Sequence, residues 1–298
     1  MSRMRRLKII GESAYYHVMS YTVSDEFYLK DIEKEKLFQI IRSFSKLYFV
    51  KVLTYCLMSN HFHLLIKMET GAELSNSEVE SRLRDFYGSN KDISSLDLSL
   101  YRKKLADLSE YIKSIKETFS KWYNKLNKRR GYFWGERFKS LLIEDGKSLL
   151  SCMAYIDLNP IRANLVKLPE DYRWSGLGYR MGNSSVFLSL EGTGISNQER
   201  YREIVYLLGG IDRSFEGKSG KISQKEIEKQ ELLGFSVSKK DLFLKRIRYF
   251  SDGLVIGSKL FIKEAYARFS NSVIFKKDRR AYDIELGGDI FAIKKLVK

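Results

Sequence analysis

The sequence is poor in the residues that build disulfide frameworks, rigid linkers and membrane spans. It has only two cysteines and two prolines among 298 residues, which argues against a disulfide-stapled secreted domain and against a proline-rich linker. Its basic N-terminal segment has no long apolar run, since Gly11, Glu12 and Ser13 interrupt it. We therefore expect neither a secretory signal nor a membrane span, but a cytoplasmic protein with reduced thiols.

Acidic residues are also in short supply. There are 37 aspartates and glutamates against 53 lysines and arginines, so the formal net charge is +16. Such an excess favours a polyanionic partner, most often nucleic acid, although a lysine-rich protein can be basic without one. The 44% of hydrophobic and 13% of aromatic residues predict a folded chain with a real core rather than a disordered one.

Hydrophobic periodicity predicts the order of elements in the first part of the chain. The strands are expected at 14–23, 48–58, 61–68 and within 131–144, and the helices at 31–47, 109–128 and 146–158. Residues 70–108 are less regular and are expected to form an insertion. The order β-α-β-β-α-β-α predicts an α+β, ferredoxin-like split βαβ fold: an antiparallel sheet with helices on one face, and its first and third strands side by side.

Two domains are expected from the composition. Residues 1–185 form the first, and residues 186–298 form a mainly helical C-terminal region. Within that region, residues 213–237 are polar and rich in Lys, Gly and Ser, which is typical of a flexible link. Two helices with a short turn between them are expected within 239–269, the second capped by Ser258. They predict either a helix-turn-helix-like DNA-binding module or a three-helix packing unit.

Two of the three histidines, His61 and His63, stand two residues apart on a predicted strand. Residues i and i+2 of a strand point to the same face, so the two imidazoles lie side by side while Phe62 points into the core. Neighbouring imidazoles are suited to binding a metal ion, although structural histidines can have the same spacing. His17, on the expected neighbouring strand, needs no metal role and is expected to be structural.

A third ligand is available on the helix predicted at 146–158. Tyr155 and Asn159 are four residues apart and therefore share a helix face. Asn159 offers a carbonyl oxygen to a metal, and Tyr155 offers a hydroxyl about one turn away. Both also have a structural interpretation, because tyrosine in an apolar helix usually packs in the core and Asn159 precedes Pro160, where the helix is expected to stop.

Three blocks of sequence, in this order, resemble the single-tyrosine HUH transposases and in particular their REP-associated branch: MSNHFHLL, GYFWGERFKS and AYIDLNPIRANLV. The resemblance covers roughly residues 10–180. It implies that His61, His63 and Asn159 bind Mg²⁺ or Mn²⁺. It further implies that Tyr155 attacks a phosphate of single-stranded DNA, often beside a hairpin. The products would be a 5′-phosphotyrosine link and a 3′-hydroxyl that can later rejoin the strand.

Cations alternate with aromatic residues at 121–139, a pattern suited to phosphate contact and base stacking. The cations expected to contact the DNA backbone are Arg129, Arg130, Arg137 and Lys139. A solvated basic face is the alternative for each of them. Arg162, just past the predicted helix, is expected either to contact DNA or to hydrogen-bond the carbonyl groups at the helix end.

Other functions share parts of this pattern. A rolling-circle replication initiator typically has lysine rather than asparagine after its tyrosine, and a relaxase places its tyrosines before the histidines, so the order here disfavours both. A domesticated, non-catalytic nucleic-acid-binding regulator is the main alternative. The sequence leaves open whether the protein is a monomer or a homodimer whose subunits exchange the catalytic helix.

Overall fold

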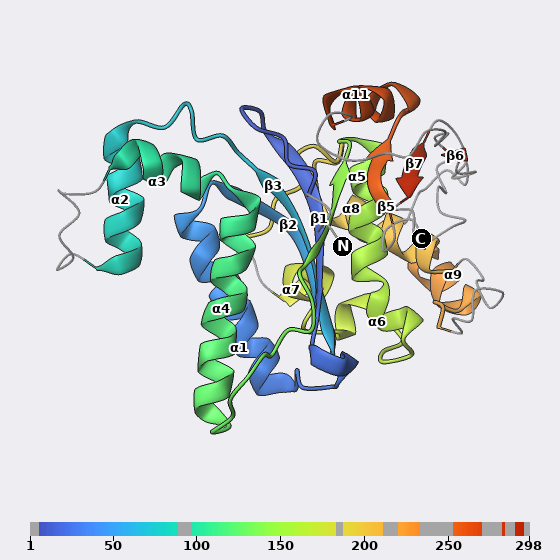
Figure 1. Ribbon diagram of the computed structural model, residues 1–298. Coiled ribbons are helices and arrows are strands. Elements are labelled where there is room, and N and C mark those ends of the chain that lie inside the picture. The colour runs from blue at the N-terminus through green and yellow to red at the C-terminus, as the bar shows by residue number, and fades with distance from the viewer. Residues whose placement is uncertain are drawn as a thin grey trace.

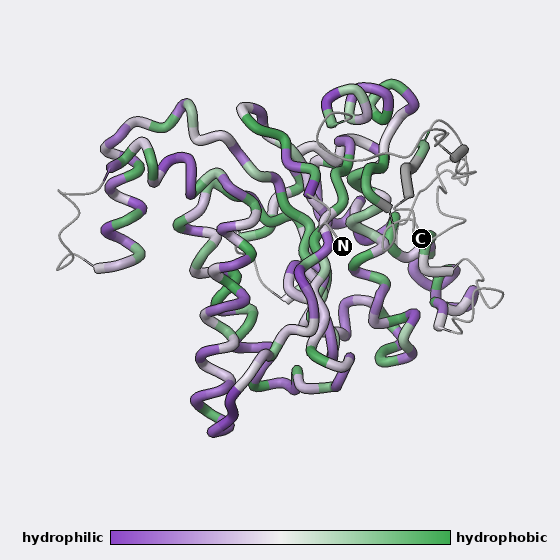
Figure 2. Tube along the Cα trace, in the orientation of Figure 1, coloured by the Kyte–Doolittle hydropathy of each residue, from purple (hydrophilic) through white to green (hydrophobic). Residues whose placement is uncertain are grey.

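A central sheet seen nearly edge-on separates two groups of helices in the computed structural model (Figure 1). The structure describes residues 6–88, 97–182, 187–210, 220–232, 253–269, 282–283 and 290–294. Hydrophobic residues are concentrated along the central strands, and hydrophilic stretches recur along the outer helices (Figure 2). Among the helices in these ranges, none has the length and apolar character needed to cross a bilayer.

The first four strands form the antiparallel core of the sheet. They are β1 (Ala14–Tyr21), β2 (Val50–Leu57), β3 (His61–Met68) and β4 (Lys139–Ile143). Their spatial order is β2-β3-β1-β4, and every neighbouring pair is antiparallel. This is the strand order of a ferredoxin-like split βαβ unit, with the first and third strands adjacent. The predicted fold class is therefore confirmed.

Helices cover both faces of this core, so the prediction that they lie on one face only is wrong. They are α1 (Asp31–Leu47), α2 (Asn76–Tyr87), α3 (Leu98–Leu105), α4 (Leu108–Leu126), α5 (Lys147–Asp157), α6 (Asn159–Arg162) and α7 (Gly176–Gly182). Helices α1 and α4 pack together on one face, as the split unit requires, while α5 and α7 lie on the other (Figure 1). Because both faces are covered, strand β2 is buried at seven of its eight positions rather than at alternate ones.

The helix ends follow local hydrogen-bonding rules with one departure from expectation. Helix α1 begins at Asp31, and the N–H of its N-cap, Lys30, donates to Glu33 Oε2 at 3.1 Å. The predicted stop at Asn159–Pro160 separates α5 from the short helix α6 rather than ending helical structure. Pro160 lies in the first turn of α6, where a missing N–H costs nothing.

The C-terminal region contributes strands as well as helices. Its elements are α8 (Gln198–Gly209), α9 (Gln224–Leu232), β5 (Gly253–Gly257), α11 (Lys259–Phe269), β6 (Tyr282–Asp283) and β7 (Phe291–Lys294). Strand β5 adds in parallel to β4, and β7 and β6 follow, which makes a seven-stranded sheet. None of these three strands is predicted from the sequence.

Two further predictions for the C-terminal region can be compared with the structure. Residues 224–232 form helix α9, so this part of the expected flexible link is helical. Helix α11 is confirmed, and Ser258 caps it by accepting a 3.2 Å hydrogen bond from Phe261 N–H. The other helix of the expected DNA-binding module falls within 233–252, outside the described residues.

Candidate active site

The two histidines of the His-x-His pair lie on the sheet face that α5 covers. Their ring centroids are 5.0 Å apart and their planes are nearly perpendicular. Phe62 lies on the opposite face, where its ring packs edge-on against Trp134 with a centroid distance of 5.4 Å. The strand alternation predicted from the sequence therefore places both imidazoles together.

Helix α5 brings Tyr155 onto the same face. The Tyr155 ring centroid is 6.0 Å from that of His63 and 6.1 Å from that of His17. Tyr155 is 3% exposed and His63 is 2% exposed, whereas His61 is half-buried. The phenol and the imidazoles thus converge within one chain.

His17 has a closer relation to the pair than the sequence suggested. Its Nε2 atom lies 2.9 Å from Nδ1 of His63, within hydrogen-bond distance, and the two rings stack at 5.1 Å. The contact arises because β1 pairs with β3 in a register that sets Met19 opposite His63. His17, two residues earlier on β1, faces the same side of the sheet. Strand adjacency was predictable, but this register was not.

Asn159 carries its amide in a defined orientation. Its Nδ2 atom donates to the carbonyl oxygens of Tyr155 at 3.1 Å and Ile156 at 3.2 Å. The amide nitrogen is thereby committed to the helix, so Oδ1 is the atom that can serve as a ligand. Within the described part of the chain, no group of three His, Cys, Asp or Glu residues is arranged to hold a metal ion. A metal bound by the two imidazoles would therefore need an oxygen ligand of the kind Asn159 offers. Such a mixed nitrogen and oxygen donor set suits Mn²⁺ or Mg²⁺ together with phosphate oxygens.

Arg162 lies against the tyrosine. Its guanidinium carbon is 4.8 Å from the centre of the Tyr155 ring, and one of its nitrogens donates to the Tyr155 carbonyl oxygen at 2.7 Å. Of the two roles expected from the sequence, the structure shows the carbonyl contact.

A buried carboxylate holds α5 in place. Asp157 is fully buried and accepts hydrogen bonds from Thr54 Oγ1 at 2.8 Å, from Leu177 N at 3.1 Å, and from the Tyr201 hydroxyl. These partners belong to β2, α7 and α8, so one side chain ties four elements together. Burial raises the pKa of Asp157 to about 6, against the lowering effect of its hydrogen bonds. Nothing local in the sequence marks this residue, since its partners are 20 to 103 positions away.

The basic segment 129–139 runs beside the end of β1, next to the histidines. Gly135 N–H donates to the Tyr21 carbonyl oxygen at 3.1 Å. The Tyr21 ring stacks on His61 at 4.9 Å, and the ammonium group of Lys139 lies 5.7 Å from the Tyr21 ring centre. The Tyr21 ring therefore contacts both the ammonium group of Lys139 and His61 of the His-x-His pair.

The other predicted DNA contacts lie along the same segment. Arg130 and Arg137 are exposed, and Arg129 is half-buried with its guanidinium 4.9 Å from the Tyr28 ring centre. Two further cations contact this segment, since Arg6 donates to the Phe138 carbonyl oxygen at 3.4 Å and Lys116 donates to the Glu136 carbonyl oxygen at 2.9 Å. Burial lowers the pKa of Arg6 to about 10, with repulsion from Arg137 as the next cause. Burial and repulsion from Arg6 lower the pKa of Lys116 to about 8.

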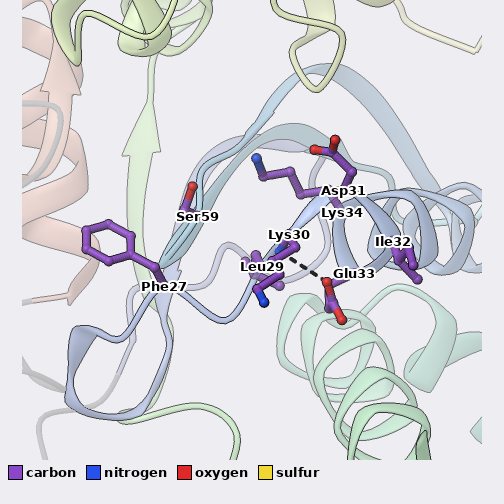
Figure 3. A pocket seen from close by; sticks show the side chains of 8 residues that line it. All are labelled: Phe27, Leu29, Lys30, Asp31, Ile32, Glu33, Lys34 and Ser59. Atoms are coloured by element: carbon purple, nitrogen blue, oxygen red, sulfur yellow. Dashed lines mark hydrogen bonds between the residues drawn. The ribbon is translucent and has the colours of Figure 1, made fainter. Parts of the chain in front are cut away.

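A hollow of about 560 Å³ lies at the start of α1 beside the β2–β3 turn, two residues before His61 (Figure 3). Its lining residues are Phe27, Leu29, Lys30, Asp31, Ile32, Glu33, Lys34 and Ser59. Two cations and two anions balance one another in this lining, and the hollow does not include Tyr155. We assign it no role in the chemistry.

Comparison with known proteins finds a resemblance to one family over the histidine-bearing part of the chain. The sequence profile of the IS200-like transposases matches residues 11–79. None of the curated proteins matches the chain significantly. Among solved structures, a REP-associated tyrosine transposase bound to a REP hairpin is 15% identical, with a TM-score of 0.43, and the match covers 66% of this chain and 99% of that one. A transposase from Deinococcus radiodurans is 12% identical, with a TM-score of 0.27, covering 46% of this chain and 85% of that one. The profile match spans β1 through β3 and both histidines of the pair, so over residues 11–79 the resemblance to the single-tyrosine transposases is confirmed.

Proposed function

We propose that the protein is a metal-dependent single-stranded DNA endonuclease and strand transferase, a transposase that cuts DNA through a 5′-phosphotyrosine intermediate. The observation that carries this proposal is the approach of Tyr155 to the histidines, with ring centroids 6.0 Å apart, inside one chain. A helix-borne phenol beside a pair of imidazoles supplies a nucleophile and two metal ligands at one place. The match to IS200-like transposases over residues 11–79 supports the same reaction class.

The residues divide the chemistry between them. Tyr155 Oη attacks phosphorus, its proton leaves to solvent or a base, the P–O3′ bond breaks, and the 3′-oxygen takes up a proton. The 5′-phosphotyrosine keeps the energy of the phosphodiester, so the 3′-hydroxyl can reverse the reaction without ATP. His61, His63 and Asn159 would hold the divalent ion, Mg²⁺ or Mn²⁺, which when bound polarises the scissile phosphate. Arg162 stabilises the phenolate that attacks.

The direction from which DNA approaches follows from burial. Of the four rings at the site, His61 is the one that solvent reaches, because His17, His63 and Tyr155 are at most 3% exposed. The cations of segment 129–139 lie on that side, with Lys139 next to the Tyr21 ring that stacks on His61. We expect a single strand to follow this segment, its phosphates on the cations, and to reach Tyr155 past His61.

The test is the formation of a covalent adduct. The protein is incubated with labelled single-stranded hairpin DNA and Mn²⁺, and the products are resolved under denaturing conditions. We expect a protein–DNA adduct that Tyr155→Phe abolishes and a chelator prevents. Tyr132→Phe is the matched control, because Tyr132 is 86% exposed and lies in the basic segment but not at the site. An adduct that survives in Tyr155→Phe would place the nucleophile elsewhere.

Binding without any adduct would favour the alternative function, a regulator that recognises nucleic acid without cutting it. The intact set of His61, His63 and Tyr155 speaks against a decayed site. Oligomeric state does not enter this test, because the tyrosine and the histidines already meet within one chain.

A further inference from the structure

Each histidine of the pair has its Nδ1 atom held by a neighbouring side chain. Nδ1 of His61 lies 2.6 Å from Oδ1 of Asn60. Nδ1 of His63 lies 2.9 Å from Nε2 of His17. A ring nitrogen engaged in this way is not available to a metal ion, so the second nitrogen of each ring, Nε2, must be the one that coordinates.

We propose that Asn60 and His17 are positioning residues that keep His61 and His63 protonated on Nδ1, so that both rings present an Nε2 lone pair to the divalent ion. This inference rests on the proposed function, because it concerns the ligands of the same metal. Neutral imidazole carries one proton, and a ring protonated on Nδ1 has its lone pair on Nε2. The tautomer is thus set before the metal arrives.

The hydrogen bonds around Asn60 determine which way its amide points. Its Nδ2 atom donates to the carbonyl oxygen of Asp25 at 3.1 Å. A carbonyl can only accept, so the amide nitrogen faces Asp25 and the amide oxygen faces His61. Since Oδ1 is an acceptor, His61 Nδ1 must carry the proton that it receives.

The loop that supplies the Asp25 carbonyl is itself strained. Ser24 and Asp25 both have left-handed backbone conformations, with φ of 57° and 55°. Non-glycine residues adopt this conformation at a cost and are enriched at functional sites. Thr22 ties the loop to the β2–β3 turn, since its N–H donates to the Asn60 carbonyl oxygen at 2.9 Å and its hydroxyl donates to the Glu26 carbonyl oxygen at 2.7 Å. The strained loop therefore serves to hold the Asn60 side chain against His61.

For His63 the tautomer follows from the proposed metal role, because either ring nitrogen of the His17–His63 contact can donate. For His63 to present Nε2, its Nδ1–H must donate to Nε2 of His17, which then carries its own proton on Nδ1. All three histidines of the chain would share the Nδ1–H tautomer, the opposite of the form that free histidine favours. Both His17 and His63 are almost fully buried, so the packing of β1 and β3 keeps the rings in place.

The test reads the tautomers directly in the metal-free, full-length protein. Long-range proton–nitrogen correlation spectra of ¹⁵N-histidine-labelled protein distinguish protonated from unprotonated ring nitrogens. They are recorded at about pH 8.5, well above the ordinary imidazole pKa of about 6.5. Only three histidines occur, so single substitutions assign every signal. We expect Nδ1–H for His61 and His63, and either ring protonated on Nε2 would overturn the proposal.

Two variants test the positioning residues separately. Asn60→Ala should move His61 towards the Nε2–H form, and His17→Phe should do the same for His63, each leaving the other ring unchanged. Mn²⁺ affinity, measured by the broadening of the histidine signals, should fall about 10- to 100-fold in each variant. Asn60→Asp keeps an acceptor oxygen and should retain the His61 tautomer. Asn127→Ala is the matched control, because Asn127 also donates its amide to a backbone carbonyl, that of Tyr123, away from the site.

The outcomes separate this inference from the proposed function. Nδ1–H rings in a protein that forms no DNA adduct would refute the function and leave the tautomers established. An adduct formed by a protein whose rings carry Nε2–H would support the proposed function and refute the proposed tautomers. If a variant fails to fold, the wild-type spectrum still decides.

Discussion

Asp157 makes the stability of this protein depend on pH, and the effect is large because the carboxylate is fully buried. Burial raises its pKa from the ordinary 3.8 to about 6. Between these two values the folded state holds a proton that the unfolded chain releases. Stability from this residue is therefore greatest at low pH and falls as the pH rises through about 6.

The magnitude follows from the displacement of the pKa. A tenfold change in proton affinity corresponds to about 1.4 kcal/mol, so the displacement of Asp157 corresponds to about 3 kcal/mol lost between about pH 4 and pH 7. The variant Asp157→Asn removes the titration while keeping a side chain of the same shape. Its oxygen can still accept from Thr54 Oγ1 and Leu177 N, which share one carboxylate oxygen in the wild type.

The assay is denaturant unfolding of wild type and variant across about pH 4 to 8, with the free energy of unfolding extrapolated to water. The difference in stability should shift in favour of Asp157→Asn by about 3 kcal/mol as the pH rises through this window. Arg180 sets the absolute level of that difference, because it is a buried cation that loses a charge partner in the variant. The change with pH does not depend on that level.

Asp171→Asn, an exposed aspartate of the same chain, provides the baseline for removing one negative charge. If the curves for wild type and Asp157→Asn run parallel over the whole window, Asp157 is ionised in both states or in neither, and the reasoning fails. A difference that shifts in favour of wild type as the pH rises would reverse the sign and would mean that pairing with Arg180 outweighs burial.

Three further outcomes are expected. Arg162→Gln should slow adduct formation about tenfold, the equivalent of the 1 to 2 kcal/mol of a desolvated cation–π contact, while Arg162→Lys should retain part of the rate. Single-turnover assays measure the rates, and equal rates for wild type and Arg162→Gln would exclude a role for the cation. The double variant Arg137→Gln, Lys139→Gln should reduce the salt dependence of single-stranded DNA binding. The slope of the logarithm of the binding constant against the logarithm of the salt concentration should fall in magnitude by about 1.4. Lys113→Gln is the control, and an unaltered slope in the double variant would mean that neither cation contacts the DNA. Ser258→Ala should lower the free energy of unfolding, measured by denaturant, by about 1 kcal/mol because it removes the cap of α11. An unchanged free energy of unfolding would mean that the backbone N–H of Phe261 finds another acceptor.

The sequence predicted the core of the fold well, because the signals that specify it are local. Strand alternation placed His61 and His63 on one face and Phe62 on the other, as the ring contacts confirm. Tyr155 and Asn159 were predicted to share one helix face, but they lie in α5 and in the first turn of α6, on either side of the break at Leu158. The added strands β5, β6 and β7 escaped prediction because they are short, of five, two and four residues, and too little alternation fits in them to mark a strand.

The residues around the site show the limit of local reasoning. His17 was interpreted as structural because nothing on its own strand indicates a role. Its contact with His63 depends on the pairing register of β1 and β3. Lys116 and Arg6 hydrogen-bond to the backbone of segment 129–139 from positions 21 and 131 residues before Arg137, so no short window of sequence contains all three.

What the sequence by itself determined is the type and order of the core elements and the faces on which His61, His63 and Tyr155 lie, because these depend on a residue's near neighbours along the chain. What only the tertiary structure decided is how those faces meet: the 6.0 Å approach of Tyr155 to His63 within one chain, and the contacts of Asp157 with β2, α7 and α8. The physical reason is that these contacts join residues far apart in sequence, and their geometry is set by the packing of whole elements against one another.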